Sequence, residues 1–183
     1  MATVINDHGI VGTTTSSNTF AQYHYISLLN SSAEIIQLHG EITPGADSKI
    51  MYFAFVTGSG TQLIPLAGRA QNSSSTSTTY HTGYDCAMHR TTMGNDQANA
   101  SGSGERLHFN IFMCADYDPS RPYAVPFLHG ECIYETSVGV TFNGYFSAQP
   151  RNAVAPVTKI RFGINSSSGF KYQITQTAIC SKT

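Results

Sequence analysis

Two runs of alternating apolar and polar side chains near the end of the chain constrain its fold more than any other feature. They occupy residues 156–179, PVTKIRFGINSSSGFKYQITQTAI, and a serine- and glycine-containing segment joins them. A period of two is typical of β-strands with one buried face, and glycine supplies the positive φ that a tight hairpin turn needs. The sequence therefore predicts a β-hairpin. The residues expected on its buried face are Ile160, Phe162, Ile164, Phe170, Tyr172 and Ile174.

The same alternation recurs along most of the chain. Residues 49–57 are apolar on both faces, which indicates a central strand covered on each side. No segment keeps a helical period. Many short strands separated by turn signals predict an all-β fold, specifically a two-sheet antiparallel sandwich, jelly-roll-like, of about nine strands. The other expected strands are residues 22–29, 34–42, 80–88, 106–115, 127–136 and 138–147.

The chain divides into an arm and one domain. Residues 1–20 show neither the helical nor the strand period and are rich in Gly, Thr and Ser, which favours an extended N-terminal docking arm. The remaining residues, 21–183, are expected to form a single β-sandwich domain, because 183 residues that are 40% hydrophobic suffice for one core. Two polar segments without period, residues 69–79 and 90–104, are expected to be long loops.

The chain carries unusually little charge. Only 11% of its residues are charged, against about 25% in an average soluble domain, and the formal net charge is −1. No basic patch is available for nucleic acid, so nucleic acid is not an expected partner. The low charge favours a surface covered by copies of the chain or by other proteins, although a hydroxyl-rich domain that stands alone would have the same composition. No signal peptide and no run of about 18 apolar residues is evident, so no membrane insertion is expected.

The cysteines and histidines do not form a recognisable metal motif. No C-x-x-C spacing is present, so reduced, buried thiols are favoured over disulfides for Cys86, Cys114, Cys132 and Cys180. His81, Cys86 and His89 form an H-x4-C-x2-H array, but the odd spacing of the first two residues places them on opposite faces of an unbroken strand. We expect no metal and no cofactor.

Paired acids were the first candidates for catalysis. Asp116 and Asp118 begin a proline-rich segment, where a solvated, self-capping turn is the ordinary arrangement. Glu131 and Glu135 share one face of a strand about 13 Å apart, which is wider than the carboxylate separations of glycoside hydrolysis. No nucleophile elbow, phosphate loop or dinucleotide motif is present. The sequence therefore predicts a protein that is not an enzyme.

Tyrosines in the expected loops point to binding. Tyrosine presents a large ring and a hydroxyl at low entropic cost, so a Tyr-Arg-Asp loop can stack on a sugar and bind its hydroxyls. The alternative is that these tyrosines pack the loop onto the sandwich or contact another subunit. The candidate binding-loop residues are Tyr80, Asp116, Tyr117, Asp118, Arg121 and Tyr123.

The order of these features resembles a group of bacteriophage virion proteins. The matching features are the segment EIIQLHGEITPGADSKIMYFAF, a Gly-Ser-Gly step, the strand YHTGYDCAM, a long loop, an Arg-Leu-His-Phe strand, a proline-rich crossing and the closing runs, over residues 34–179. The group consists of β-sandwich modules of tail fibres, baseplate appendages and capsid decorations. The Leu-Tyr-Gly element that usually ends the group's last strand is replaced here by Gln176, Thr177 and Ala178.

The resemblance implies a non-enzymatic structural protein, a subunit of a tail fibre or baseplate appendage, with a host-surface glycan as an additional ligand. It would form a homo-oligomer, expected to be a trimer, and contact other virion proteins through its N-terminal arm. Its place would be the virion, after synthesis in the host cytoplasm. The alternatives are a capsid decoration, as a cement or head-fibre protein, and, from another class, a stand-alone carbohydrate-binding module.

Overall fold

The described residues of the chain form strands and no helix. The computed structural model describes residues 2–4, 10–29, 35–45, 50–58, 60–72, 78–88, 106–116, 126–135, 141–151, 156–165 and 167–179. No helix able to span a membrane occurs among them. The strands are β1 (Ala2–Val4), β2 (Ile10–Ala21), β3 (Tyr23–Ser27), β4 (Ile35–Pro44), β5 (Met51–Thr57), β6 (Gln62–Ile64), β7 (Leu66–Asn72), β8 (Thr79–Gly83), β9 (Cys86–Ala87), β10 (Leu107–Cys114), β11 (Phe127–Glu135), β12 (Thr141–Pro150), β13 (Val157–Ile164) and β14 (Phe170–Ile179).

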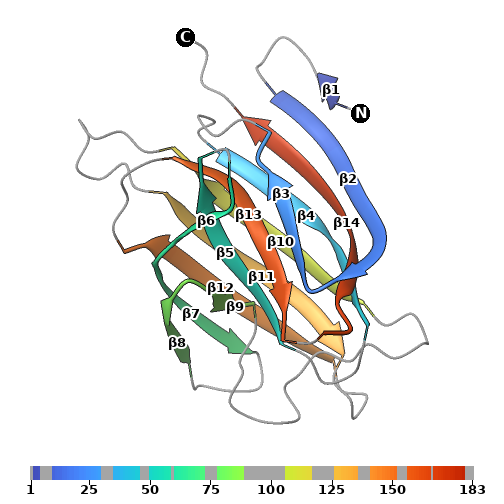
Figure 1. The fold of residues 1–183 in the computed structure, drawn as a ribbon, viewed down its shortest axis with the longest axis vertical. Helices are drawn as coiled ribbons and strands as arrows, with labels where there is room; N and C mark the ends of the chain where they lie inside the picture. The colour runs from blue at the N-terminus through green and yellow to red at the C-terminus, as the bar shows by residue number, and fades with distance from the viewer. Residues whose placement is uncertain are drawn as a thin grey trace.

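The strands build two antiparallel sheets that pack face to face (Figure 1). The large sheet has nine strands in the order β1-β2-β14-β4-β10-β11-β12-β7-β8. The small sheet has the order β3-β13-β5-β6, and β9 pairs with β5. This arrangement confirms the predicted all-β sandwich. The described residues hold fourteen strands instead of about nine. The expected arm contains β1 and most of β2, residues 62–72 contain β6 and β7, and the expected strand at 80–88 is split into β8 and β9.

Eight of the strands form a jelly roll. They are β2, β14, β4 and β10 in the large sheet and β3, β13, β5 and β6 in the small one. Counted in chain order from 1 to 8, these two rows follow the orders 1-8-3-6 and 2-7-4-5. Each sheet therefore alternates strands from the two ends of the chain, as two nested Greek keys do.

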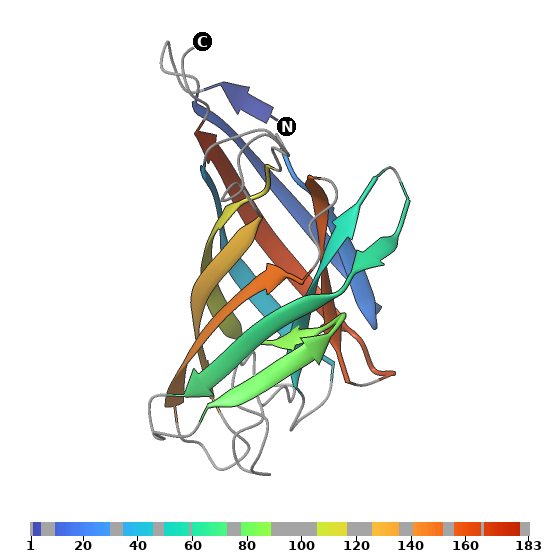
Figure 2. The same cartoon turned by 90° about the vertical axis from the view of Figure 1, so that its left-hand side faces the viewer.

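Four further strands widen the large sheet beyond β10. These strands, β11, β12, β7 and β8, are called the extension below. Figure 2 shows its last two strands, β7 and β8, along the edge of the sandwich that faces the viewer. The extension gives the large sheet a broad outer face, which the eight jelly-roll strands alone would not provide.

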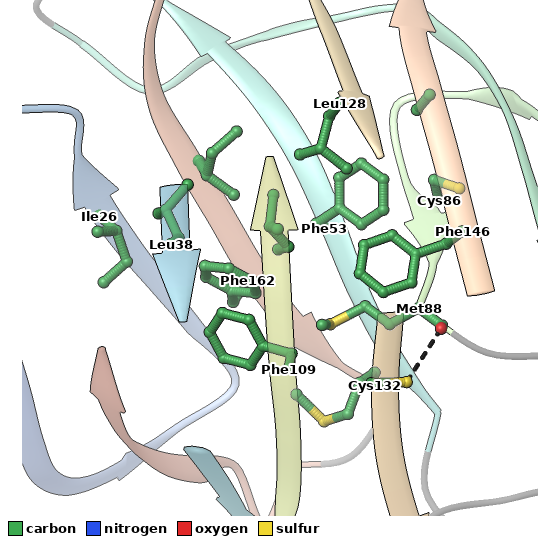
Figure 3. Packing of buried hydrophobic residues seen from close by; sticks show 14 of the residues in the cluster. Ile26, Leu38, Phe53, Cys86, Met88, Phe109, Leu128, Cys132, Phe146 and Phe162 are labelled. Carbon is green, nitrogen blue, oxygen red and sulfur yellow. Dashed lines mark hydrogen bonds between the residues drawn. The ribbon is translucent and has the colours of Figure 1, made fainter. Parts of the chain in front are cut away.

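The core lies between the sheets, where aromatic rings from both layers meet (Figure 3). Phe53 of β5 and Phe146 of β12 have ring centroids 5.4 Å apart, and Phe109 of β10 and Phe162 of β13 have centroids 5.3 Å apart. Such pairs stabilise the contact beyond the area they bury. Alternate residues of β4 and β10 are buried on the inner face of the large sheet, in keeping with the strand period of residues 34–42 and 106–115: Ile36, Leu38, Ile42, Leu107, Phe109, Ile111 and Met113.

The predicted closing hairpin is wrong, although its buried face is largely correct. β13 pairs with β3 and β5 in the small sheet, whereas β14 pairs with β2 and β4 in the large sheet. The connection between them therefore crosses from one layer to the other. Gly169 in this connection has φ of +66°, which is the left-handed region that favours glycine. Five of the six predicted inward residues are buried, and Tyr172 is half-buried.

The structure also differs from the predicted arm at residues 1–20. Residues 10–21 are extended, but they form β2 and pair with β14 within the large sheet. Their Ser and Thr side chains hide the strand period, because the hydroxyls tolerate both faces of the sheet. Thr14 Oγ1 and Thr175 Oγ1, for example, form a cross-strand hydrogen bond of 2.9 Å. Docking of this segment on other proteins stays a prediction.

Two further segments differ from their sequence interpretation. The expected loop at 69–79 contains the end of β7 and the start of β8. The expected strand at 80–88 leaves the large sheet after β8 and joins the small sheet as β9. An unbroken strand would place Tyr80, Tyr84, Cys86 and Met88 on one face, and the break separates them. Tyr80 and Tyr84 are exposed, whereas Cys86 and Met88 are buried.

A buried arginine ties the outer face of the small sheet to the segment after β8. Arg161 of β13 is only 8% exposed, pairs with Asp85, and lies with its guanidinium carbon 4.6 Å from the ring centroid of Tyr23. A buried charge is strongly destabilising when its partner is removed. The ion pair therefore fixes the path of the chain from the extension into the small sheet.

We expect Asp85→Asn to lower the free energy of unfolding by about 1–3 kcal/mol, because Arg161 would keep its burial and lose its counter-charge. Urea unfolding followed by circular dichroism measures this change. Glu41→Gln is the matched control, since its partner Arg106 is exposed and the loss there is expected to be far smaller. Equal losses in both variants would contradict this role of Arg161.

The thiols of Cys86 and Cys132 are buried and free, as predicted. Burial raises the pKa of Cys86 to about 12 and also raises the pKa of Cys132. Cys132 Sγ donates a hydrogen bond of 3.2 Å to the carbonyl of Met88 (Figure 3). Cys114 is free and half-buried, and Cys180 lies outside the described residues.

In the folded protein at neutral pH, iodoacetamide is therefore expected to leave Cys86 and Cys132 unmodified, because the reactive thiolate is absent and the sulfur is covered. Both should react fully after unfolding. Mass spectrometry of peptides from protein labelled with and without denaturant measures the fraction of each cysteine that is modified. Labelling of Cys132 in the folded protein as fast as Cys114 would show that the core is open.

Candidate binding groove

The structure places only part of the predicted binding loop. Tyr80 lies on β8 and is 77% exposed. Asp116 is half-buried two residues after the end of β10, and it makes interactions of its own. Tyr117, Asp118, Arg121 and Tyr123 lie outside the described residues.

Tyr80 belongs to a groove on the outer face of the extension. Two adjoining hollows of about 320 Å³ and about 200 Å³ share three of their lining side chains and together form what we call the aromatic groove. Phe127 and Tyr145 along it are close to half exposed. The side chains that define the groove are Arg69, Tyr80, Phe127, His129, Tyr145 and Ser147.

Strand register explains why these side chains meet. Phe112 of β10 stands opposite His129, His129 opposite Ser147, Ser147 opposite Arg69, and Arg69 opposite Tyr80. Directly opposed residues on one face of an antiparallel sheet have Cβ atoms about 5 Å apart. One continuous row of outward side chains therefore crosses five strands, and the aromatic groove follows it.

Aromatic stacking holds the side chains at the centre of this row. The imidazole of His129 stacks against the ring of Phe112, with centroids 5.6 Å apart and planes 25° apart. It is also parallel to the ring of Phe127, at 6.5 Å and 5°. Neighbouring rings restrict each other's rotamers, so the groove has a preorganised apolar wall.

Polar groups border the same wall. Arg69 Nε donates a hydrogen bond of 3.2 Å to Ser147 Oγ. The amide of Gln149 and the hydroxyl of Tyr80 also belong to lining residues. A flat aromatic surface bordered by hydroxyl, amide and guanidinium groups can stack on a sugar ring and bind its hydroxyls.

Sequence reasoning missed most of this groove. Tyr80 was a candidate binding residue, but Arg69 fell in an expected loop, and no saccharide-binding role was predicted for Phe127, His129 or Tyr145. A signal was present in residues 127–134, where Phe127, His129, Glu131 and Ile133 alternate with buried residues. Their partners across the sheet come from distant segments, and the sequence alone does not give the register.

A second hollow on the same sheet has a different character. This polar hollow, of about 550 Å³, lies over β14, β4 and β10 and is lined by His39, Glu41, Arg106 and His108, among others. Arg106 forms an ion pair with Glu41. Its one phenyl ring, that of Phe109, is buried, so among the described residues the polar hollow has no exposed Phe or Tyr ring.

The histidine and cysteine array is divided between the two sheets. His81 lies on β8, Cys86 lies on β9, and His89 is outside the described residues. Burial lowers the pKa of His81. Within the described part of the chain, no three His, Cys, Asp or Glu side chains are close enough together to hold a metal ion.

Fold and groove together define the molecule as a jelly-roll sandwich whose large sheet is widened by an extension that carries an aromatic groove. Comparisons with protein-family models, with curated proteins and with solved structures gave no match.

Proposed function

We propose that this chain is a non-enzymatic structural subunit of a bacteriophage virion, in a tail fibre or baseplate appendage, and that its aromatic groove binds a saccharide of the host surface. The observation that carries the binding role is the row of exposed rings and polar groups across the extension. The virion setting is supported by the sequence resemblance and by the low charge.

The lining of the groove supports binding over catalysis. Among the described residues that line its two hollows, none is Asp or Glu. Glycoside hydrolysis ordinarily needs two carboxyl groups beside the scissile bond. The groove instead offers the groups of a binding site, namely rings for stacking and donors for hydroxyls.

A glycan array tests the binding role. The wild-type protein is expected to bind a defined set of bacterial surface oligosaccharides. The double variant Tyr80→Ala, Phe127→Ala should lose about tenfold or more in affinity, because exposed aromatic anchors carry much of the energy in such sites. Tyr25→Ala, on the small sheet, is the matched control, since it also removes an exposed tyrosine and should leave binding unchanged.

Two results would count against this site. If wild type and the double variant bind the same oligosaccharides equally, the saccharide site lies elsewhere. If the wild-type protein binds none of them, the groove does not recognise saccharides.

The assembly role has its own test. Ile35 and Ile133 are large apolar side chains exposed on the outer face of the large sheet, which supports contacts with other copies or other virion proteins. Size-exclusion chromatography with light scattering is expected to give an oligomer, a trimer by our proposal. A strict monomer that never sediments with virions would favour the alternative of a stand-alone carbohydrate-binding module. Location on the head in labelled particles would favour a capsid decoration.

A further inference from the structure

We propose that the aromatic groove selects a saccharide that carries a carboxylate, such as a uronic-acid sugar, and that Arg69 binds this carboxylate. The inference rests on the proposed saccharide binding and names the chemical class of its ligand. Three properties of Arg69 carry it: the lack of an ion-pair partner among the described residues, the orientation of its guanidinium group and its position beside Tyr80.

The described lining of the groove is positive. Arg69 is its one permanently charged side chain, and none of the described residues that line the two hollows is Asp or Glu. The acid nearest along β11, Glu131, stands opposite Tyr145 and lines a separate hollow with His108. In a chain of net charge −1, this local excess of positive charge complements an anion.

One hydrogen bond orients the guanidinium of Arg69, and this bond uses only its Nε donor. Its Nε donates to Ser147 Oγ, which fixes the plane of the group. Its two terminal nitrogens form no hydrogen bond or ion pair with any described residue. A guanidinium offers parallel N–H donors that match the two oxygens of a carboxylate, and such charge-assisted pairs are about twice as strong as neutral hydrogen bonds.

The position of Arg69 suits a sugar stacked in the groove. Arg69 and Tyr80 are direct partners across β7 and β8. A pyranose ring that rests on Tyr80 therefore has the guanidinium beside its edge, where the carboxylate of a uronic acid projects. The arrangement combines an apolar surface for the ring with one cation for the acid.

The polar hollow provides the contrast. Arg106 lies on the same sheet face, but Glu41 already neutralises it by an ion pair. Because Glu41 neutralises the charge of Arg106, we expect Arg106 to bind an external anion more weakly than Arg69 does. Arg106→Gln is therefore the matched control for Arg69→Gln.

The experiment uses an array of bacterial surface oligosaccharides in which each uronic-acid sugar is printed beside its methyl ester. Wild type is expected to bind acidic members more tightly than their esters. Arg69→Gln should lower the affinity for the acidic members by about tenfold to a hundredfold and the affinity for the esters by much less, so that the preference for acids over esters is lost. Arg106→Gln should bind as wild type does.

The outcomes separate this inference from the proposed function. Equal binding of acids and esters that still depends on Tyr80 would overturn the carboxylate inference and leave saccharide binding standing. An acid preference that survives Arg69→Gln would also overturn it. Absence of binding to any member would overturn both.

Discussion

Replacing Phe162 by Ala is expected to lower the free energy of unfolding by about 3–5 kcal/mol, the usual cost of removing a buried phenylalanine. Phe162 is fully buried on β13, and its ring meets that of Phe109 on β10 in the opposite sheet. The substitution removes the transfer energy of the ring and leaves a cavity between the two sheets. Hydrogen bonds between the strands of each sheet make the sheets stiff. The sheets therefore cannot close the space fully.

Urea unfolding monitored by circular dichroism measures this loss. Phe127→Ala is the matched control, because it removes the same ring from the outer face of the large sheet, where Phe127 is 47% exposed. The control is expected to change stability by less than about 1 kcal/mol. Similar losses in the two variants would contradict the assignment of inner and outer faces.

Gly169→Ala is expected to destabilise the protein by about 2–4 kcal/mol, the sum of a left-handed backbone for a residue with a Cβ and a steric overlap. Gly169 has φ of +66°, and a Cβ there would lie 2.6 to 2.8 Å from backbone atoms of Ala21. The connection from β13 to β14 passes directly against the end of β2. The added methyl group must therefore displace backbone.

Gly58→Ala separates the two causes. Gly58 has φ of +69°, but a Cβ there would meet no atom of the described residues within 4 Å. It should show only the backbone cost, about 1–2 kcal/mol. Thermal or urea unfolding of both variants gives the comparison. If Gly169→Ala is no more destabilising than Gly58→Ala, the close approach between Gly169 and Ala21 does not exist in solution.

The sequence allowed the strands with one clearly apolar face to be predicted, because a period of two is a local property. Ile160 and Phe162 were expected to be buried, and both are. Strand pairing could not be predicted in the same way. A hairpin and a crossing between sheets place the same residues inward, so the alternation around Gly169 is compatible with either, and only the partners of β13 and β14 distinguish them.

The aromatic groove was harder to predict from the sequence for a related reason. Tyr80 was recognisable because an aromatic residue beside a polar segment is unusual. Arg69, Ser147 and His129 are distant in sequence and meet only through the register of β7, β12 and β11. The Thr- and Ser-rich strand β2 escaped notice because it lacks an apolar face, and its partner β14 lies at the far end of the chain.

Mapping of a bound oligosaccharide by backbone-amide chemical shifts is the most direct test of the aromatic groove. Labelled protein would be titrated with the oligosaccharide that binds best on the array. We expect the perturbed amides to cluster on β7, β8, β11 and β12, around Arg69 and Tyr80. Perturbations that cluster instead on the small sheet, around β3 and β13, would contradict it.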